Sequence, residues 1–516
     1  MLSPTYILFP SLVLLWIWNR RKKVNTKGLP LPPGPARLPI VGNGLQLPTG
    51  KHWMVYDSWI KRYGDIVYFE LLDQRFVVLG SSKRTKELLG ERSSIYSGRQ
   101  LPPFVASVLD YGFVFFALNY GESWRRHRRT FHEYFQLNAV ERYRPAEIRE
   151  AHALLRNLLN TPDNFLRHLR LFFTAVIMDV VYGIPIKNLD DPYLLKSEEA
   201  AIAFTQGAIF GTFWIDHVPF MIPFLKNLPS WIPGAASINL WDKWRATGSF
   251  LHHSPFESVK DDLAKGVDRS CVAAHLLNSL PHGDQKERAE AEAVARSVSA
   301  TAYFTGSNTA LSAAMNFFLA MILYPEAQKK AQAEIDRVVG PNRLPDFNDQ
   351  ESLPYVAAIT KEVLRWRLVI PNVGHLATED DEYDGYFIPK GTIVIGNNWS
   401  ILHDPEVYPD PEKFRPERFV NDGQNIPAPD PETAFGYGRR ICPGRHLAKN
   451  ELFIIIASVL ASFNILPPVD GSGNPINAEV DQMNVFISYP NPFKCIIKPR
   501  SPKAEALIRA TEEAEI

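Results

Sequence analysis

The feature that most constrains the fold is a long stretch, from roughly Gln285 to Tyr324, with no proline and little to break a helix except Gly306. At 1.5 Å per residue, a helix of ~38 residues is on the order of 55 Å long, so it must cross the whole domain that contains it. Its middle, residues 305–309, is small and polar, which is unusual at the centre of a buried helix. A chain of 516 residues with 46% hydrophobic and 22% charged residues is globular. The sequence therefore predicts one very large domain or two, crossed by this helix.

A second stretch, residues 435–444, places Cys442 near the end of a loop that contains three glycines, Gly436, Gly438 and Gly444. Glycines let backbone N–H groups approach a sulfur closely, and the helix that follows would bring its positive N-terminal end to the same sulfur. These features suit a thiolate that ligates haem iron. Phe435 would shield the ligand from water, and Arg440 would pair with a haem propionate. The alternative is a glycine-rich turn around a buried structural cysteine.

Charge and cysteine usage exclude several classes of protein. The chain has 56 basic and 56 acidic residues, so its formal net charge is zero and nothing indicates a nucleic-acid partner. Its three cysteines, Cys271, Cys442 and Cys495, lie far apart in sequence. This usage fits a reducing compartment and a free thiolate better than a disulfide framework.

The N-terminal segment predicts a membrane anchor. Residues 6–18 are apolar and uncharged, and a basic cluster at residues 20–23 follows at once. This order is the reverse of that in a cleavable signal peptide, and the basic cluster would hold the downstream chain in the cytoplasm. We therefore expect an anchor with a basic stop-transfer (1–24), a proline-rich spacer (25–39), a catalytic domain (40–500) and a polar tail (501–516). A helix lying in the membrane interface is the alternative.

The loop around Cys442 matches every fixed position of the pattern F-x-x-G-x-R-x-C-x-G. It resembles the haem-binding signature of the cytochrome P-450 monooxygenases, in particular the fungal microsomal members. The resemblance implies a mainly α fold, a large helical domain with a small β-rich region. It also implies haem b whose iron is ligated by the Cys442 thiolate, with electrons from NADPH through a reductase.

The small polar centre of the long helix resembles the family motif A/G-G-x-D/E-T, in which the threonine and the preceding acid deliver protons. Gly306 and Thr309 match, whereas Asn308 stands where the family has an acid, and an amide cannot carry and release a proton as a carboxylate does. The resemblance assigns catalytic roles to Thr309, Asn308 and Gly306. A helix kink with Ser/Thr side chains bonded to the backbone is the alternative.

Other haem contacts follow from the resemblance. Trp124 and Arg128 lie at i and i+4 on one helix face, like the family's Trp/Arg pair that binds haem propionates. His375 resembles a propionate-contacting histidine, although Gly374 stands where relatives often have proline. We expect a docking surface for an acidic reductase, formed by Arg125, Arg126, Arg129, Arg439 and Arg445. A solvated helix face is the alternative for the basic residues beside Arg128.

Three residues are expected to have a structural role. Glu362 and Arg365 are one helical turn apart and resemble the family's E-x-x-R motif, and Arg418 lies in the later segment Pro416–Phe419. A buried network of the three would be costly unless fully paired, so we expect it to fix the cysteine loop.

Shorter patterns predict local structure. The runs 66–71 and 75–79 read as a hairpin, and Asp384-Gly385 marks the turn of another. The segment 485–498 reads as a third hairpin, and Pro325 to Gly340 as a helix with its caps.

The expected function is oxidation of an apolar small molecule by a haem-thiolate monooxygenase, in fungal secondary metabolism such as terpenoid biosynthesis. The expected location is the endoplasmic reticulum membrane, with a cytosolic catalytic domain that is monomeric and binds no nucleic acid. Two alternatives are a haem-thiolate isomerase or dehydratase that does not activate O2, which Asn308 motivates, and a non-catalytic haem protein.

Overall fold

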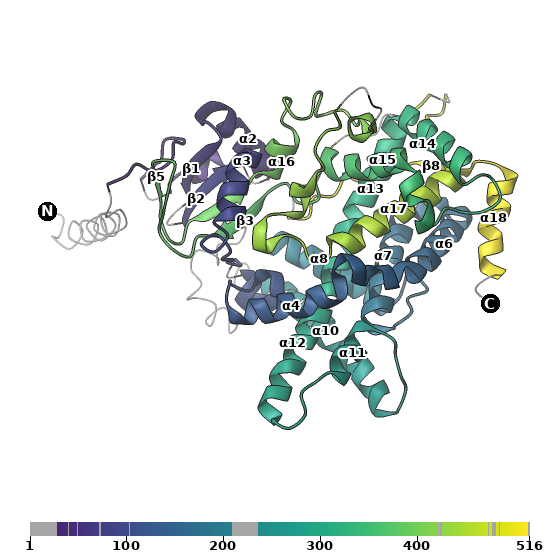
Figure 1. The fold of residues 1–516 in the computed structure, drawn as a ribbon, viewed down its shortest axis with the longest axis horizontal. Helices are drawn as coiled ribbons and strands as arrows, with labels where there is room; N and C mark the ends of the chain where they lie inside the picture. Colours follow the sequence, from purple (N-terminus) through teal and green to yellow (C-terminus); the bar gives the residue numbers. More distant parts are fainter. Residues whose placement is uncertain are drawn as a thin grey trace. The chain divides into compact units, whose positions relative to one another are not determined.

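The computed structural model describes residues 28–513, except 40, 49, 72–73, 103, 209–235, 422, 424–425, 473, 477–480 and 484–485. The expected anchor, residues 1–24, lies outside the described residues. The chain divides into two compact units (Figure 1). The strand unit comprises Met1–Gln100, Asn372–Ile401 and Tyr437–Arg440, and the helical unit comprises Leu101–Pro371, Leu402–Gly436 and Ile441–Ile516. The segment expected to be one catalytic domain thus contributes to both units.

The strand unit is built on a four-stranded sheet of order β1-β2-β6-β3. The hairpin predicted at 66–79 is observed: β1 (Ile66–Leu71) and β2 (Gln74–Leu79) pair antiparallel. β2 pairs in parallel with β6 (Ile393–Gly396), which pairs antiparallel with β3 (Val373–Leu376). A separate hairpin joins β4 (Asp381–Tyr383) to β5 (Tyr386–Ile388), and the unit also contains α2 (His52–Tyr63) and α3 (Ser82–Thr85).

Both outer strands of this sheet are covered by irregular segments. Along β1, Tyr68 N–H donates to Pro33 O at 2.8 Å and Asn43 N–H donates to Glu70 O at 2.6 Å. Along β3, Gly98 and Leu376 exchange two backbone hydrogen bonds of 3.1 and 2.9 Å. The described part of the expected proline-rich spacer, residues 28–39, therefore belongs to the fold instead of lying free beside it.

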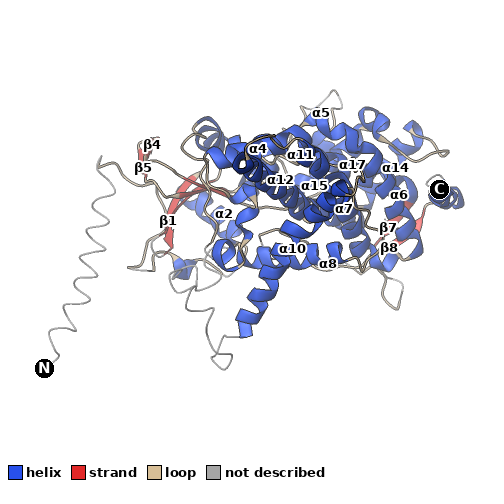
Figure 2. Ribbon diagram, turned by 90° about the horizontal axis from the view of Figure 1, so that it is seen from below, coloured by secondary structure: helices blue, strands red, loops and turns tan. Residues whose placement is uncertain are grey.

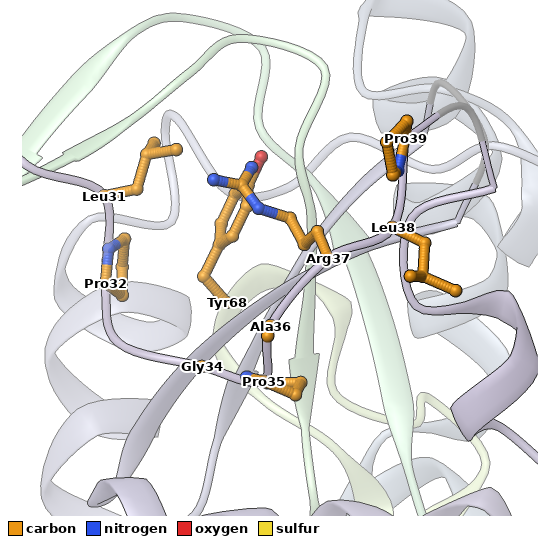
Figure 3. A pocket seen from close by; sticks show the side chains of 9 residues that line it. All are labelled: Leu31, Pro32, Gly34, Pro35, Ala36, Arg37, Leu38, Pro39 and Tyr68. Carbon is orange, nitrogen blue, oxygen red and sulfur yellow. The ribbon is translucent and has the colours of Figure 1, made fainter.

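The proline-rich segment and Tyr68 also line an open hollow of about 650 Å³ (Figure 3). The Arg37 guanidinium lies 5.3 Å from the centre of the Tyr68 ring and pairs with Glu70 Oε1 at 2.7 Å. Gly34 is required here because a Cβ at this position would lie 1.9 Å from Tyr68 O. The proline-rich segment thus runs close to the backbone of Tyr68, and only glycine at position 34 permits this contact.

The helical unit contains most of the helices, and Figure 2 shows them in blue, with strands β7 and β8 in red among them. Its long helices are α4 (Glu122–Phe135), α6 (Arg144–Asn160), α7 (Phe165–Tyr182), α8 (Pro192–Gly207), α10 (Ala236–Ala264), α14 (Pro325–Val338), α15 (Pro354–Trp366) and α17 (Arg445–Ser462). The shorter elements are α5 (Leu137–Val140), α11 (Val272–Asn278), α16 (Asn398–Leu402, which starts in the strand unit), α18 (Pro502–Glu513), β7 (Phe463–Leu466) and β8 (Ile496–Pro499).

The long helix predicted from the sequence is observed as two successive helices, α12 (Gln285–Gly306) and α13 (Thr309–Leu323) (Figure 1). Every side chain of α13 from Ala310 to Ile322 is buried. Among the described residues, the stretch Gln285–Leu323 is the one helical stretch long and apolar enough to cross a membrane, but 83% of its apolar window is buried inside the protein. It is therefore the core helix of the unit.

Two C-terminal expectations differ from the structure. Residues 485–498 do not pair with each other as a hairpin among the described residues; β8 pairs antiparallel with β7, which directly follows α17. The expected polar tail contains α18, which packs on α6 and α17. The reason is an i,i+4 apolar pair, Ala504 and Ile508, both buried.

A pair of buried carboxyl groups lies between α6 and α17. Glu147 is 0% exposed and Glu451 is 2% exposed, and neither carboxyl oxygen of Glu147 has a hydrogen-bond partner among the described residues. Burial raises the pKa of Glu147 to about 8, against a smaller lowering by Arg144. Burial, and then the nearby Glu147, raise the pKa of Glu451 well above its ordinary value. Both groups are therefore held as neutral acids near neutral pH.

This pair predicts that stability falls as pH rises. Between the ordinary carboxyl pKa of 4.5 and about 8, the folded chain holds a proton on Glu147 that the unfolded chain has lost. The free energy of unfolding should therefore decrease by ~1.4 kcal/mol per pH unit for this proton. Glu147→Gln should make the pH dependence shallower, measured by urea unfolding across this range. Glu150→Gln on the same helix is the control, and an equal effect of the two changes would contradict the assignment.

Candidate active site

Two hydrogen bonds to the backbone of Cys442 hold the loop before α17. Cys442 N–H donates to Phe435 O at 2.8 Å, and Arg445 Nη1 donates to Cys442 O at 3.1 Å. Gly436 has φ +86°, a left-handed conformation that favours glycine, and it ends the short turn Glu432–Phe435. Gly444 is the N-cap residue of α17, so the helix begins three residues beyond the cysteine. The loop therefore places the sulfur at a helix N-terminus.

The Cys442 sulfur has polar neighbours that would stabilise a thiolate. Burial is the largest influence and raises the pKa of the Cys442 thiol above its ordinary value; the backbone N–H groups of Gly444 and Arg445 and the charges of Arg128 and Arg445 lower the pKa and offset burial in part. Burial lowers the pKa of Arg128, while Cys442 raises it. A buried sulfur that faces two guanidinium groups and two N–H groups is a suitable anionic ligand for a metal.

The other two cysteines differ from Cys442 in their neighbours. Burial, and to a smaller extent Asp163, raise the pKa of the Cys495 thiol to about 12. Cys271 is 3% exposed. Backbone N–H groups and Arg269 lower the pKa of its thiol, but burial and the carboxylate of Asp179 raise it. Of the three, only Cys442 has two arginines acting on it and no carboxylate among the causes of its shift.

Helix α4 places the expected Trp/Arg pair on one face. Trp124 is buried and Arg128 is partly buried, one turn further along. The neighbouring Arg125 and Arg129 are exposed, and Arg126 is partly exposed and lies 3.6 Å from Glu290. The arginine run thus has one inward position, and the remaining charges face solvent.

The strand unit gathers a second group of basic side chains. His375 on β3 is 1% exposed; its Nδ1 lies 2.7 Å from Tyr96 O, and its Nε2 has no hydrogen-bond partner among the described residues. Arg440 is buried and donates from Nε to Ser97 O at 2.8 Å. Burial, then Arg99 and Arg440, lower the pKa of His375 well below its ordinary value. His375 is therefore a neutral imidazole on which the charges of two guanidinium groups act.

Arg99 was not predicted from the sequence. Its Nη1 donates to Gly374 O, and burial lowers its pKa to about 10. The sequence offered a clue to Arg99, because this residue ends the block Tyr96-Ser97-Gly98-Arg99. In the structure, the carbonyl group of Tyr96 contacts His375 and that of Ser97 accepts from Arg440. The glycine before His375 also has a role, since Gly374 O accepts from Arg99. A buried group of this kind is a site for an anion.

The break between α12 and α13 presents a ladder of hydroxyls. Thr305 Oγ1 donates to Thr301 O at 2.8 Å, and Thr309 Oγ1 donates to Thr305 O at 3.0 Å. Gly306 lies against α7, where a Cβ would approach Ile177 Cγ1 to 2.8 Å. Asn308, the fourth residue of the motif, is 0% exposed and contacts residues of α7 and α8. Gly306 is thus explained by close helix packing as well as by the local break.

The expected structural network is brought together in the helical unit. Glu362 accepts from Arg365 Nε at 2.7 Å, Arg365 Nη2 at 2.9 Å and Arg418 Nε at 3.2 Å, and also from the backbone N–H of residue 415 at 2.8 Å. Glu362 and Arg365 are both 0% exposed. Arg365 further donates to carbonyl groups of Leu402, Pro411 and Lys413. The buried charges are therefore fully paired, the condition for keeping them.

The chain matches the family model described as Cytochrome P450 over residues 32–496. Cytochrome P450 monooxygenase COX2 of Coprinopsis cinerea is 44% identical over 491 residues, which cover 95% of this chain and 93% of that protein. COX1 of the same organism is 40% identical over 498 residues, covering 95% of each chain. Tryptamine 4-monooxygenase of Psilocybe cyanescens is 36% identical over 507 residues, covering 96% of this chain and 98% of that protein. The chain therefore belongs to the cytochrome P450 family.

Membership settles the class of reaction and cofactor that the sequence predicted. The protein is an oxidoreductase, a monooxygenase that uses haem b held by a cysteine thiolate and takes electrons from a reductase. The fold, mainly helical with small sheets, is the one predicted. The family acts on hydrophobic substrates.

Gly306 provides a test of the helix contact at the centre of the unit. Gly306→Ala should reduce the free energy of unfolding by ~1–3 kcal/mol, because the added methyl group meets the branched Ile177 side chain near its backbone. Gly90→Ala is the matched control, since nothing lies within 4 Å of its Cβ position, and it should change stability by less than ~0.5 kcal/mol. Denaturant unfolding of the haem-loaded chain measures both. Equal effects would show that the contact with α7 does not constrain Gly306.

Proposed function

We propose that this protein inserts one atom of O2 into an apolar small molecule in fungal secondary metabolism, such as terpenoid biosynthesis, with Cys442 as the iron ligand. The observation that carries the proposal is the setting of the Cys442 sulfur, which faces the N–H groups of Gly444 and Arg445 and the charge of Arg128. Cys271 and Cys495 are buried cysteines with a carboxylate nearby, so neither fits the ligand as well.

Within each unit, the side chains described above suit a haem propionate. In the helical unit these are Trp124 and Arg128. In the strand unit they are His375 and Arg440, with Arg99 added to the set. His375 Nε2, which lacks a protein partner among the described residues, supports this assignment. Phe435, Gly436 and Gly438 would shield and shape the cysteine loop. When bound, haem supplies the iron at which dioxygen is reduced.

Thr309 is the residue proposed to handle protons on the distal side. Its hydroxyl group donates to Thr305 O, and the oxygen lone pairs remain available to accept from water. Gly306 keeps α12 close to α7, so the break that precedes Thr309 stays in place. In this proposal Thr309 holds a water molecule next to the reacting oxygen, while the surrounding side chains orient the substrate.

An aromatic cluster beside the helix break supports an apolar substrate. Phe304 lies 5.7 Å from Tyr111 and 5.2 Å from Phe204, and Phe204 lies 5.8 Å from both Phe116 and Phe486 (ring centroids). Phe116 and Phe486 are only partly buried. Aromatic surfaces of this kind bind hydrocarbon skeletons by burial of apolar area.

The proposed partner is NADPH–cytochrome P-450 reductase. The exposed Arg125, Arg129 and Arg439, with the partly exposed Arg126 and Arg445, provide positive charge for an acidic partner. The proposed location is the endoplasmic reticulum membrane, through the N-terminal anchor, with the catalytic domain in the cytosol. This proposal rests on the sequence of residues 1–24 and on the fungal relatives.

The reduced carbon monoxide difference spectrum tests the assignment of the ligand. The wild-type protein should show a strongly red-shifted Soret band, and Cys442→Ser should lose it because a hydroxyl group cannot replace the thiolate. Cys271→Ser and Cys495→Ser are matched controls that should keep the band. A band that survives in Cys442→Ser, or disappears in either control, would contradict the assignment.

A spectral titration tests the substrate class. Substrate entry should shift the ferric haem from low to high spin, because the substrate displaces water from the site. We expect a sesquiterpene alcohol to cause this shift with a Kd on the order of 10 µM, and tryptamine to cause none, because a cationic amine is costly to bury among aromatic rings without an anion. The reverse result would favour a substrate like that named for the tryptamine 4-monooxygenase of Psilocybe cyanescens.

A further inference from the structure

At the break between α12 and α13, a side chain replaces a backbone hydrogen bond that a continuous helix would have. In a continuous helix, Asn308 N–H would donate to the carbonyl group of Phe304, four residues earlier. In this structure, Asn308 N–H turns to Thr305 O at 3.4 Å, and Asn308 Nδ2 donates to Phe304 O at 2.9 Å. The side-chain amide thus replaces the backbone donor that the break removes, and Phe304 O stays satisfied inside the protein.

Neighbouring helices fix the orientation of this amide. Arg170 Nη1 of α7 donates to Asn308 Oδ1 at 3.2 Å, and Nδ2 also donates to Ser197 Oγ of α8 at 3.1 Å. Because a guanidinium group can only donate, Arg170 determines which end of the amide is the oxygen. Arg170 Nη2 also lies 3.5 Å from Glu198 Oε1, so the Arg170 charge is paired with this carboxylate.

The backbone on the far side of the break is held too. Tyr489 donates its hydroxyl proton to Asn308 O at 3.1 Å. Burial raises the pKa of Tyr489 to about 12, with Arg170 lowering it and Glu198 raising it less strongly, so the phenol remains a donor. Asn308 is 0% exposed, and both ends of its amide and its carbonyl group are engaged.

A carboxylate at this position could still accept from Arg170, but it could not donate to Phe304 O. It would place two acceptor oxygens 2.9 Å apart at the Phe304 carbonyl group, where burial makes an unsatisfied pair costly. We propose that Asn308 is a positioning residue whose amide, oriented by Arg170, holds the helix break that sets Thr309. The acid of the family motif is thus replaced by a structural amide. This inference rests on the role proposed for Thr309.

The experiment compares Asn308→Asp, Asn308→Ala and Arg170→Met in the haem-loaded full chain. Two properties are measured between about pH 5 and pH 8: the thermal midpoint, and the Kd of ferric haem for imidazole, a small probe of the distal side. Asn316→Asp is the matched control. Asn316 is also 0% exposed, lies on α13 and donates from Nδ2 to a backbone carbonyl, Arg367 O, at 3.0 Å.

If the amide holds the break, both changes at Asn308 lower the thermal midpoint at pH 8 and shift the imidazole Kd in the same direction, by about tenfold. Arg170→Met shifts the Kd in that direction by a smaller factor. Asn308→Asp recovers toward wild type as pH falls, because a protonated carboxyl group can donate to Phe304 O as the amide does, whereas Asn308→Ala does not recover. Asn316→Asp lowers the midpoint but leaves the imidazole Kd unchanged.

Two results would overturn the inference. Asn308→Asp with wild-type midpoint and imidazole Kd at every pH would show that a carboxylate is tolerated at the break. Shifts in opposite directions for Asp and Ala would indicate a proton-relay position instead of a clamp. A changed thermal midpoint with an unchanged imidazole Kd would support the role of the Asn308 amide in holding the helix break. The same result would contradict its proposed effect on Thr309.

Discussion

The buried carboxylate of Glu362 is the interaction on which the helical unit most depends. It is completely enclosed, and it is tolerable because two guanidinium groups and a backbone N–H group surround it. Arg365 extends the network to three carbonyl groups in residues 402–413. The described residues from 403 to 434 form only short turns, such as Pro416–Phe419, so this network holds the segment where strands or helices are absent. Loss of Glu362 would leave two guanidinium groups without their carboxylate partner.

Both units use the same electrostatic device at the positions assigned to haem. In the helical unit, Arg128, Arg445 and backbone N–H groups oppose the cost of a charged Cys442 sulfur. In the strand unit, burial and then the charges of Arg99 and Arg440 lower the pKa of His375 and keep it neutral. Each group is an excess of positive charge that one ligand would neutralise, a thiolate in the first case and an external anion in the second. Cofactor binding and folding stability are expected to be coupled for this reason.

Much of the site could be predicted from sequence because its parts are local. The hairpin at 66–79, the Asp384-Gly385 turn with both residues at positive φ, and the helix after Pro325 each follow from turn and capping rules. What escaped prediction depends on contacts between distant segments. Arg99 became visible only through the carbonyl it reaches, and Asn308 through Arg170, 138 residues away. The strand β8 was assigned to the wrong partner because residues 463–466, its real neighbour, directly continue a helix.

The covered edges of the four-stranded sheet have a consequence for assembly. An open edge presents a row of unpaired N–H and C=O groups on which another chain can add a strand. Here the segment that contains Pro33 and Asn43 bonds to β1, and Gly98 bonds to β3. Proline cannot extend the ladder, because it lacks an N–H donor. The same close contact that requires glycine at position 34 therefore protects the protein against edge-to-edge aggregation.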